Sequence, residues 1–273
     1  MLDLFVHWRK IFIVVILIAS LFTLSGCTTQ TGTSSAGWSA EKPLSLDEAE
    51  VRRRAHIRLE LAANYFESGQ TTVALDEVKQ SLLTDPAYAD AYNLRGLIYM
   101  RLNDYPQAEE SFLLALGARA NDPGITHNYA WLLCQQEKYL KADQQFEQVL
   151  SHAAYPARSK TLMAQGLCRA RAGENEKAEY ALSKAYELDA GNPIVAYNLA
   201  SLLLQRGDLV RSQFYIRRLN NSDLANAESL WLGMKIENAL GDATALRQLA
   251  SQLKRRFADS REQIMYERGA FNE

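Results

Sequence analysis

Residues 89–122, ADAYNLRGLIYMRLNDYPQAEESFLLALGARAND, decide the fold. Small and large residues recur there at three- and four-residue steps: Tyr92, Gly96 and Tyr99, then Ala108, Phe112 and Ala115. This spacing puts each set on one helix face and predicts two amphipathic helices, at about 89–102 and 106–118, joined by a tight turn. Small residues at Gly96 and Ala108 would let the two backbones approach, and Tyr99 and Phe112 would fill the space beside them.

The same pattern recurs along the chain at a spacing of about 34 residues. Copies lie near 55–88, 89–122, 123–158, 159–192, 193–225 and 226–258, and the sixth is looser than the others. The fourth copy starts two residues late, which indicates an insertion near Tyr155 and Pro156. Arg169 stands where an aromatic residue is usual and Ser212 replaces the second alanine, so both could loosen the local packing.

A period of 34 residues with small–aromatic–small spacing resembles the tetratricopeptide repeat. The resemblance implies an all-α solenoid in which about six helix–turn–helix repeats wind into a right-handed superhelix. We expect this superhelical domain over residues 47–260, followed by a C-terminal tail at 261–273. Outside the N-terminal apolar run, no alternation of β-branched residues favours strands.

The chain of 273 residues has a formal net charge of −2 and a pI of about 6.1. It therefore lacks the excess of positive charge that binding to nucleic acid requires, and we expect no nucleic-acid partner.

The N-terminus reads as a targeting segment. Arg9 and Lys10 precede an apolar run at 11–24, which has the length of a signal-peptide core and is short for a membrane span. The sequence Leu-Ser-Gly-Cys at 24–27 follows and resembles the bacterial lipoprotein signal. That resemblance implies that residues 1–26 are removed and that Cys27 carries the lipid. Because Thr28 rather than aspartate follows the cysteine, it also implies the outer membrane, with the protein on the periplasmic face.

Residues 27–46 are rich in Thr, Ser and Gly and predict a flexible tether from the lipidated cysteine. The run Arg52-Arg53-Arg54 comes soon after it. Such a run is most often a solvated helix face, and contact with anionic lipid headgroups is the alternative.

No catalytic constellation, phosphate-binding loop or metal-ligand spacing is present in the sequence. We expect that the protein is not an enzyme, and that it binds no metal, no small-molecule substrate and no cofactor other than the covalent lipid. Cys134 and Cys168 fall on the first helices of the third and fourth repeats. They are expected to be small buried residues; a disulfide stays open, although it needs Cα atoms closer than packed helix axes normally allow.

Binding in such arrays is expected on the concave face, which the first helix of each repeat lines. The inward positions combine apolar side chains with amides and arginines, a mixture that suits a peptide or helix laid in a groove. The residues predicted to contact a partner are Leu59, Phe66, Asn93, Leu97, Met100, Arg101, His127, Trp131, Gln135, Met163 and Tyr197.

Four further stretches resemble one family, the type IV pilus pilotin lipoproteins of the PilF/PilW type: residues 155–159, 187–193, 228–242 and 252–260. The resemblance implies an outer-membrane lipoprotein that binds subunits of the pilus secretin and promotes their localisation and multimerisation. The alternative is another periplasmic scaffold lipoprotein, such as an adaptor for β-barrel assembly or for murein enzymes. The two differ in the partner that the groove would capture.

Overall fold

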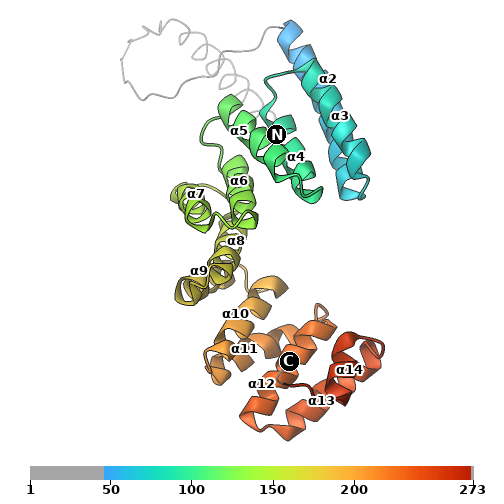
Figure 1. Cartoon of the computed structure of the whole chain (residues 1–273), viewed down its shortest axis with the longest axis vertical. Coiled ribbons are helices and arrows are strands. Elements are labelled where there is room, and N and C mark those ends of the chain that lie inside the picture. Colours follow the sequence, from blue (N-terminus) through green and yellow to red (C-terminus); the bar gives the residue numbers. More distant parts are fainter. Residues whose placement is uncertain (1–45, 272–273) are drawn as a thin grey trace, which may run out of the picture. The chain divides into compact units, whose positions relative to one another are not determined.

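The computed structural model describes residues 46–271, which form thirteen helices and contain no strand (Figure 1). The all-α prediction is confirmed. The predicted signal peptide at 1–26, the lipidation site Cys27 and all but the last residue of the tether at 27–46 lie outside the described residues. Within 46–271, none of the helices combines the length and apolar character that crossing a membrane requires.

Six helical hairpins follow one another along the chain, one for each predicted repeat. Their helices are α2 (Leu46–Glu67) with α3 (Thr71–Thr84), α4 (Ala89–Arg101) with α5 (Tyr105–Ala118), α6 (Pro123–Gln135) with α7 (Tyr139–Ser151), α8 (Arg158–Arg171) with α9 (Asn175–Leu188), α10 (Pro193–Gln205) with α11 (Leu209–Asn220), and α12 (Ala227–Leu240) with α13 (Ala243–Arg256). Each second helix also contacts the first helix of the next repeat, so the hairpins stack as a tetratricopeptide-type solenoid.

The hairpin turns depend on residues that tolerate left-handed backbone. Gly207 joins α10 to α11 with φ of 76°, and Asn103 takes the corresponding position between α4 and α5 with φ of 58°. An aspartate follows each of them, and the side chains of Asp104 and Asp208 accept hydrogen bonds from backbone N–H groups in the first turn of the second helix. The turn therefore ends one helix and begins the next within a few residues.

Close approach of the two helices within a hairpin depends on the small residues that the sequence singled out. A Cβ atom placed on Gly96 would lie 2.7 Å from the ring of Phe112, which is itself fully buried. Gly166 repeats this arrangement against Leu182, whose Cγ would lie 2.6 Å from the added atom. The predicted close approach of the two helices at Gly96 is confirmed.

The C-terminal segment differs from the expected tail. Residues Arg261–Glu267 form a short helix, α14, which packs on α12 and α13. Gln263 is buried, and the ring of Phe271 stacks on Trp231 at a centroid distance of 5.1 Å. The segment covers the end of the sixth repeat, a role that its short and mostly polar sequence did not indicate.

Candidate protein-binding groove

The first helices of the first four repeats lie side by side, since α2 contacts α4, α4 contacts α6 and α6 contacts α8. Most of the predicted partner-binding side chains are half-buried on these helices and on α10: Leu59, Phe66, Asn93, Leu97, Met100, Trp131, Gln135, Met163 and Tyr197. Arg101 is exposed. Leu97 and Met100 pack against the buried cluster that includes Phe112 and Ile125, so their inner faces belong to the core and their outer faces to the surface.

Two arginines reach from one first helix to the aromatic residue of the preceding one. The guanidinium of Arg101 lies 3.8 Å from the ring centroid of Phe66, and its Nη1 donates to the Phe66 carbonyl oxygen at 2.7 Å. A similar contact joins the third and fourth repeats, where the guanidinium of Arg171 lies 5.1 Å from the ring centroid of Trp131. These contacts hold large aromatic faces in place while leaving each arginine exposed to solvent.

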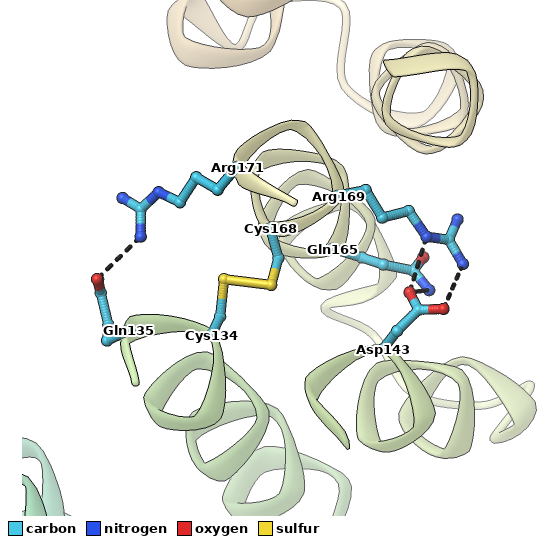
Figure 2. Close-up of a disulfide and its surroundings, with 7 residues drawn as sticks. All are labelled: Cys134, Gln135, Asp143, Gln165, Cys168, Arg169 and Arg171. Carbon is cyan, nitrogen blue, oxygen red and sulfur yellow. Dashed lines mark hydrogen bonds and ion pairs between the residues drawn. A yellow bond between two sulfur atoms is a disulfide. The ribbon is translucent and has the colours of Figure 1, made fainter. Parts of the chain in front are cut away.

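Amide side chains supply further links along the same surface. Asn128 Nδ2 donates to Asn93 Oδ1 at 3.0 Å between α6 and α4, and Arg171 Nη1 donates to Gln135 Oε1 at 2.8 Å (Figure 2). These contacts link α2 to α4, α4 to α6 and α6 to α8 along a surface that combines aromatic faces, amides and cations.

His127 is the exception among the predicted contact residues, because only 5% of it is exposed. Its Nδ1 lies 2.9 Å from Thr161 Oγ1 on α8, and its ring meets Phe146 edge-on. Burial, with a smaller contribution from the positive charge of Lys160, lowers the pKa of His127 to about 4. The imidazole is therefore neutral near pH 7 and supports the contact between α6 and α8 from beneath the groove surface.

Cys134 and Cys168 form a disulfide between α6 and α8 (Figure 2). Both residues are buried, as expected, and their Cα atoms are 5.8 Å apart. The argument that packed helices would keep these Cα atoms too far apart is wrong for this pair. The two cysteines are 34 residues apart and lie on the first helices of neighbouring repeats, α6 and α8, which contact each other directly.

Arg169 lies on the other side of α8 and faces α7 (Figure 2). Its Nε and Nη2 donate to the two carboxylate oxygens of Asp143 at 2.7 and 3.1 Å, and Gln165 Nε2 donates to the same carboxylate. The side chain is 12% exposed. An ion pair with two hydrogen bonds thus occupies the position where the repeat pattern has an aromatic residue, and it ties α8 to α7.

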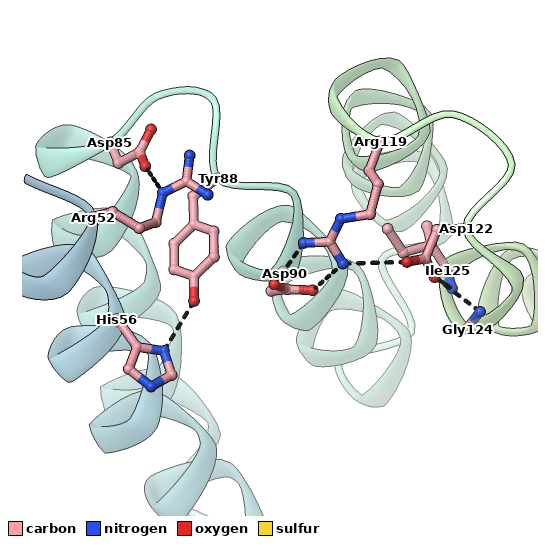
Figure 3. A network of polar contacts seen from close by, with 9 residues as sticks. All are labelled: Arg52, His56, Asp85, Tyr88, Asp90, Arg119, Asp122, Gly124 and Ile125. Carbon is pink, nitrogen blue, oxygen red and sulfur yellow. Dashed lines mark hydrogen bonds and ion pairs between the residues drawn. The ribbon is translucent and has the colours of Figure 1, made fainter. Parts of the chain in front are cut away.

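Polar links also join the first three repeats (Figure 3). Arg52 pairs with Asp85 and covers the ring of Tyr88, whose hydroxyl lies 2.9 Å from His56 Nδ1. The other two arginines of the run at 52–54 pair with Glu50. This run is therefore an ion-paired helix surface. Further along, Arg119 bridges Asp90 and Asp122, whose carboxylate also caps α6.

Known proteins with tetratricopeptide repeats are similar to this chain. The model of the tetratricopeptide repeat family matches residues 59–123 and 130–193. The type IV pilus assembly protein PilF of Pseudomonas aeruginosa is 26% identical over 240 residues, which cover 88% of this chain and 91% of PilF. The crystal structure of PilW, a widely conserved type IV pilus biogenesis factor, superimposes with a TM-score of 0.72 at 27% identity. The chain is homologous to PilF and PilW.

The match to PilW covers 78% of this chain and 97% of PilW. A structure of Pseudomonas aeruginosa PilF matches with a TM-score of 0.70 at 24% identity and covers 81% and 98% of the two chains. The homology thus extends over nearly all of each relative rather than over a single pair of repeats.

Proposed function

We propose that this PilF/PilW homologue is a pilotin: an outer-membrane lipoprotein of type IV pilus biogenesis that binds secretin subunits and promotes their localisation and multimerisation. The observation that carries the proposal is the near full-length homology to a type IV pilus assembly protein and to a type IV pilus biogenesis factor. The protein would act by binding, without catalysing a reaction.

The sequence around Cys27 supports the membrane part of the proposal. Lipid chains on this residue would give stable anchoring to the outer membrane, and the tether would let the repeats reach a partner on the periplasmic face. A disulfide between Cys134 and Cys168 agrees with this location, because disulfides persist in the oxidising periplasm.

The groove supports the binding part. It presents half-buried apolar faces at Leu97, Met100 and Trp131 beside exposed Arg101 and the amide of Gln135. Apolar faces flanked by fixed hydrogen-bonding groups suit a peptide segment or amphipathic helix of a secretin subunit. Anchoring such a protein to a membrane also raises the local concentration of the subunits that it carries.

The anchor is tested by Cys27→Ser in the chromosomal gene. We expect the variant protein to accumulate without membrane attachment, and secretin multimers to disappear from the outer membrane. Secretin multimers at wild-type amount and location in a strain that lacks the gene altogether would overturn the pilotin function.

The groove is tested by a double substitution, Met100→Glu with Trp131→Ala, and by capture of the secretin on the purified full chain. Leu140→Ala is the matched control, because Leu140 is a large apolar residue on a second helix with 75% of its surface exposed. We expect the double variant to lose the secretin and the control to retain it, with equal helix content by circular dichroism. Retention by both would exclude the groove, and capture of β-barrel assembly proteins or murein enzymes in place of a secretin would favour the scaffold alternative.

A further inference from the structure

The C-terminal end of the repeat array carries more basic than acidic side chains. Between Ala243 and Phe271 there are six basic and three acidic residues, although the whole chain has a net charge of −2. The basic residues are Arg247, Lys254, Arg255, Arg256, Arg261 and Arg268. Across the part of the chain that the structure describes, none of these six forms an ion pair, whereas Arg52, Arg119, Arg169 and Arg217 all do.

These side chains point outward on two helices. Arg247, Lys254 and Arg255 are spaced seven and eight residues apart, so they lie along one exposed side of α13, next to the side that buries Ala250 and Leu253. Arg261 begins α14 and Arg268 is its C-cap residue; the two are seven residues apart and both are exposed. Because α14 packs on α13, the two outward faces belong to one end of the array (Figure 1).

Local helix stability does not account for this arrangement. Cations in the last turn of a helix offset its partial negative charge, which explains a preference for Lys254 and Arg255 at the end of α13. Arg256 is already engaged, since it donates to the Ala225 carbonyl oxygen at 2.9 Å. Arg261, however, opens α14, where a cation meets the positive end of the helix, and Arg247 lies in the interior of α13.

We propose that the outward faces of α13 and α14 form a docking surface for an acidic segment of a protein partner. We call it the basic end surface and define it by Arg247, Lys254, Arg255, Arg261 and Arg268. Four of these five cations are arginines, whose planar guanidinium groups match carboxylates with two hydrogen bonds each. The surface is separate from the groove on the first helices, so the proposal does not depend on what the groove binds.

A polypeptide fits this surface better than a membrane does. A helix that lies on a bilayer turns a broad apolar face to the lipid, whereas the apolar face of α13 is packed into the protein. Ile264 is the one large apolar side chain that is exposed on α13 and α14. The remaining attraction is electrostatic, which is the kind that steers and orients complementary protein surfaces.

The test measures binding of a fluorescein-labelled oligoglutamate peptide to the full chain in a nonionic detergent at low ionic strength. The end-surface variant, Lys254→Glu with Arg255→Glu, reverses two charges of the basic end surface. The matched control is Lys141→Glu with Lys160→Glu, which makes the same change in net charge at two exposed lysines that form no ion pair within residues 46–271. We expect peptide binding to wild type to weaken as salt is added. The affinity for the peptide should fall about tenfold in the end-surface variant and change less than about twofold in the control.

Equal losses in the two double variants would show a general charge effect and overturn the proposal. The absence of peptide binding by wild type at low salt would also overturn it. So would binding to phosphatidylglycerol vesicles that is lost in the end-surface variant, if the peptide itself does not bind. Circular dichroism checks that each variant is folded. If the charge reversal unfolds the protein, Lys254→Gln with Arg255→Gln replaces it, and a neutral pair that binds as tightly as wild type also counts against the docking surface.

Discussion

The step from the third repeat to the fourth and the step from the fourth to the fifth are held together in different ways. In the first, α6 and α8 are joined by the disulfide Cys134–Cys168 and by the contact of His127 with Thr161. In the second, the links run through α9: the carboxylate of Glu179 accepts from Arg206 and Arg211, and the rings of Tyr186 and Tyr215 meet edge-on at 4.9 Å. Nearly half of each arginine side chain is exposed.

Repeats of nearly identical shape are therefore coupled to their neighbours in different ways. In a solenoid, stability is approximately a sum of the stabilities of the repeats and of the interfaces between neighbours. A covalent link between α6 and α8 constrains the unfolded chain, whereas exposed ion pairs contribute little because water and salt screen them. We therefore expect the part of the groove formed by α6 and α8 to be more rigid than the step that follows it.

The largest effect is expected from removal of the disulfide, with Cys134→Ala and Cys168→Ala. For a loop of 34 residues, the loss of the cross-link should lower the free energy of unfolding by about 4 kcal/mol. Urea denaturation measures this change. Wild type in dithiothreitol should fall by a similar amount and the variant should not respond to the reductant; equal stability of wild type with and without reductant would contradict the comparison.

Packing within the fourth repeat gives the next largest effect. A Cβ atom on Gly166 would lie 2.6 Å from Leu182 and 3.2 Å from the backbone oxygen of Ala178, so Gly166→Leu should destabilise the protein by about 3 kcal/mol. Gly117→Leu is the control, because an added Cβ there meets nothing within 4 Å. Thermal melting compares the two, and similar melting temperatures would mean that α8 and α9 are not as closely packed as described.

Acidification tests the step from the third repeat to the fourth through the protonation of His127. Its pKa is lowered to about 4 in the folded protein, while the unfolded chain protonates near the ordinary value of 6.5. The folded state thus binds fewer protons, so its stability is complete above about pH 6.5 and is lost as the pH falls toward 4. At pH 5 the expected loss is about 2 kcal/mol relative to pH 7.

Urea denaturation of His127→Gln at both pH values isolates this contribution. The variant should lose less stability than wild type on acidification, by about the 2 kcal/mol assigned to the imidazole. Parallel pH profiles for the two proteins would show that the ring is not excluded from solvent at the interface of α6 and α8.

The repeat and its register could be predicted from the sequence because they follow from the spacing of small and large residues around positions such as Gly96 and Phe112. The links between repeats could not be predicted in the same way. Whether Cys134 meets Cys168, or whether Arg169 finds Asp143, depends on how neighbouring helices cross, and the period alone does not specify that. The inward spacing predicts His127 in the groove, yet its ring is buried against Thr161 and Phe146.

The smallest effect is expected from Glu179→Gln, which acts on the step from the fourth repeat to the fifth. This change removes the carboxylate that Arg206 and Arg211 share, and both guanidinium groups can turn to water because their side chains are 44% and 49% exposed. Exposed pairs contribute less than about 1 kcal/mol each, so global stability should hardly change. Amide hydrogen exchange, however, should become faster in α10 and α11 while α6 and α8 keep their protection, because the ion pairs act only between the fourth and fifth repeats. Faster exchange in α6 as well would mean that the two steps open as one unit, and that the disulfide does not divide the array into a firmer and a looser part.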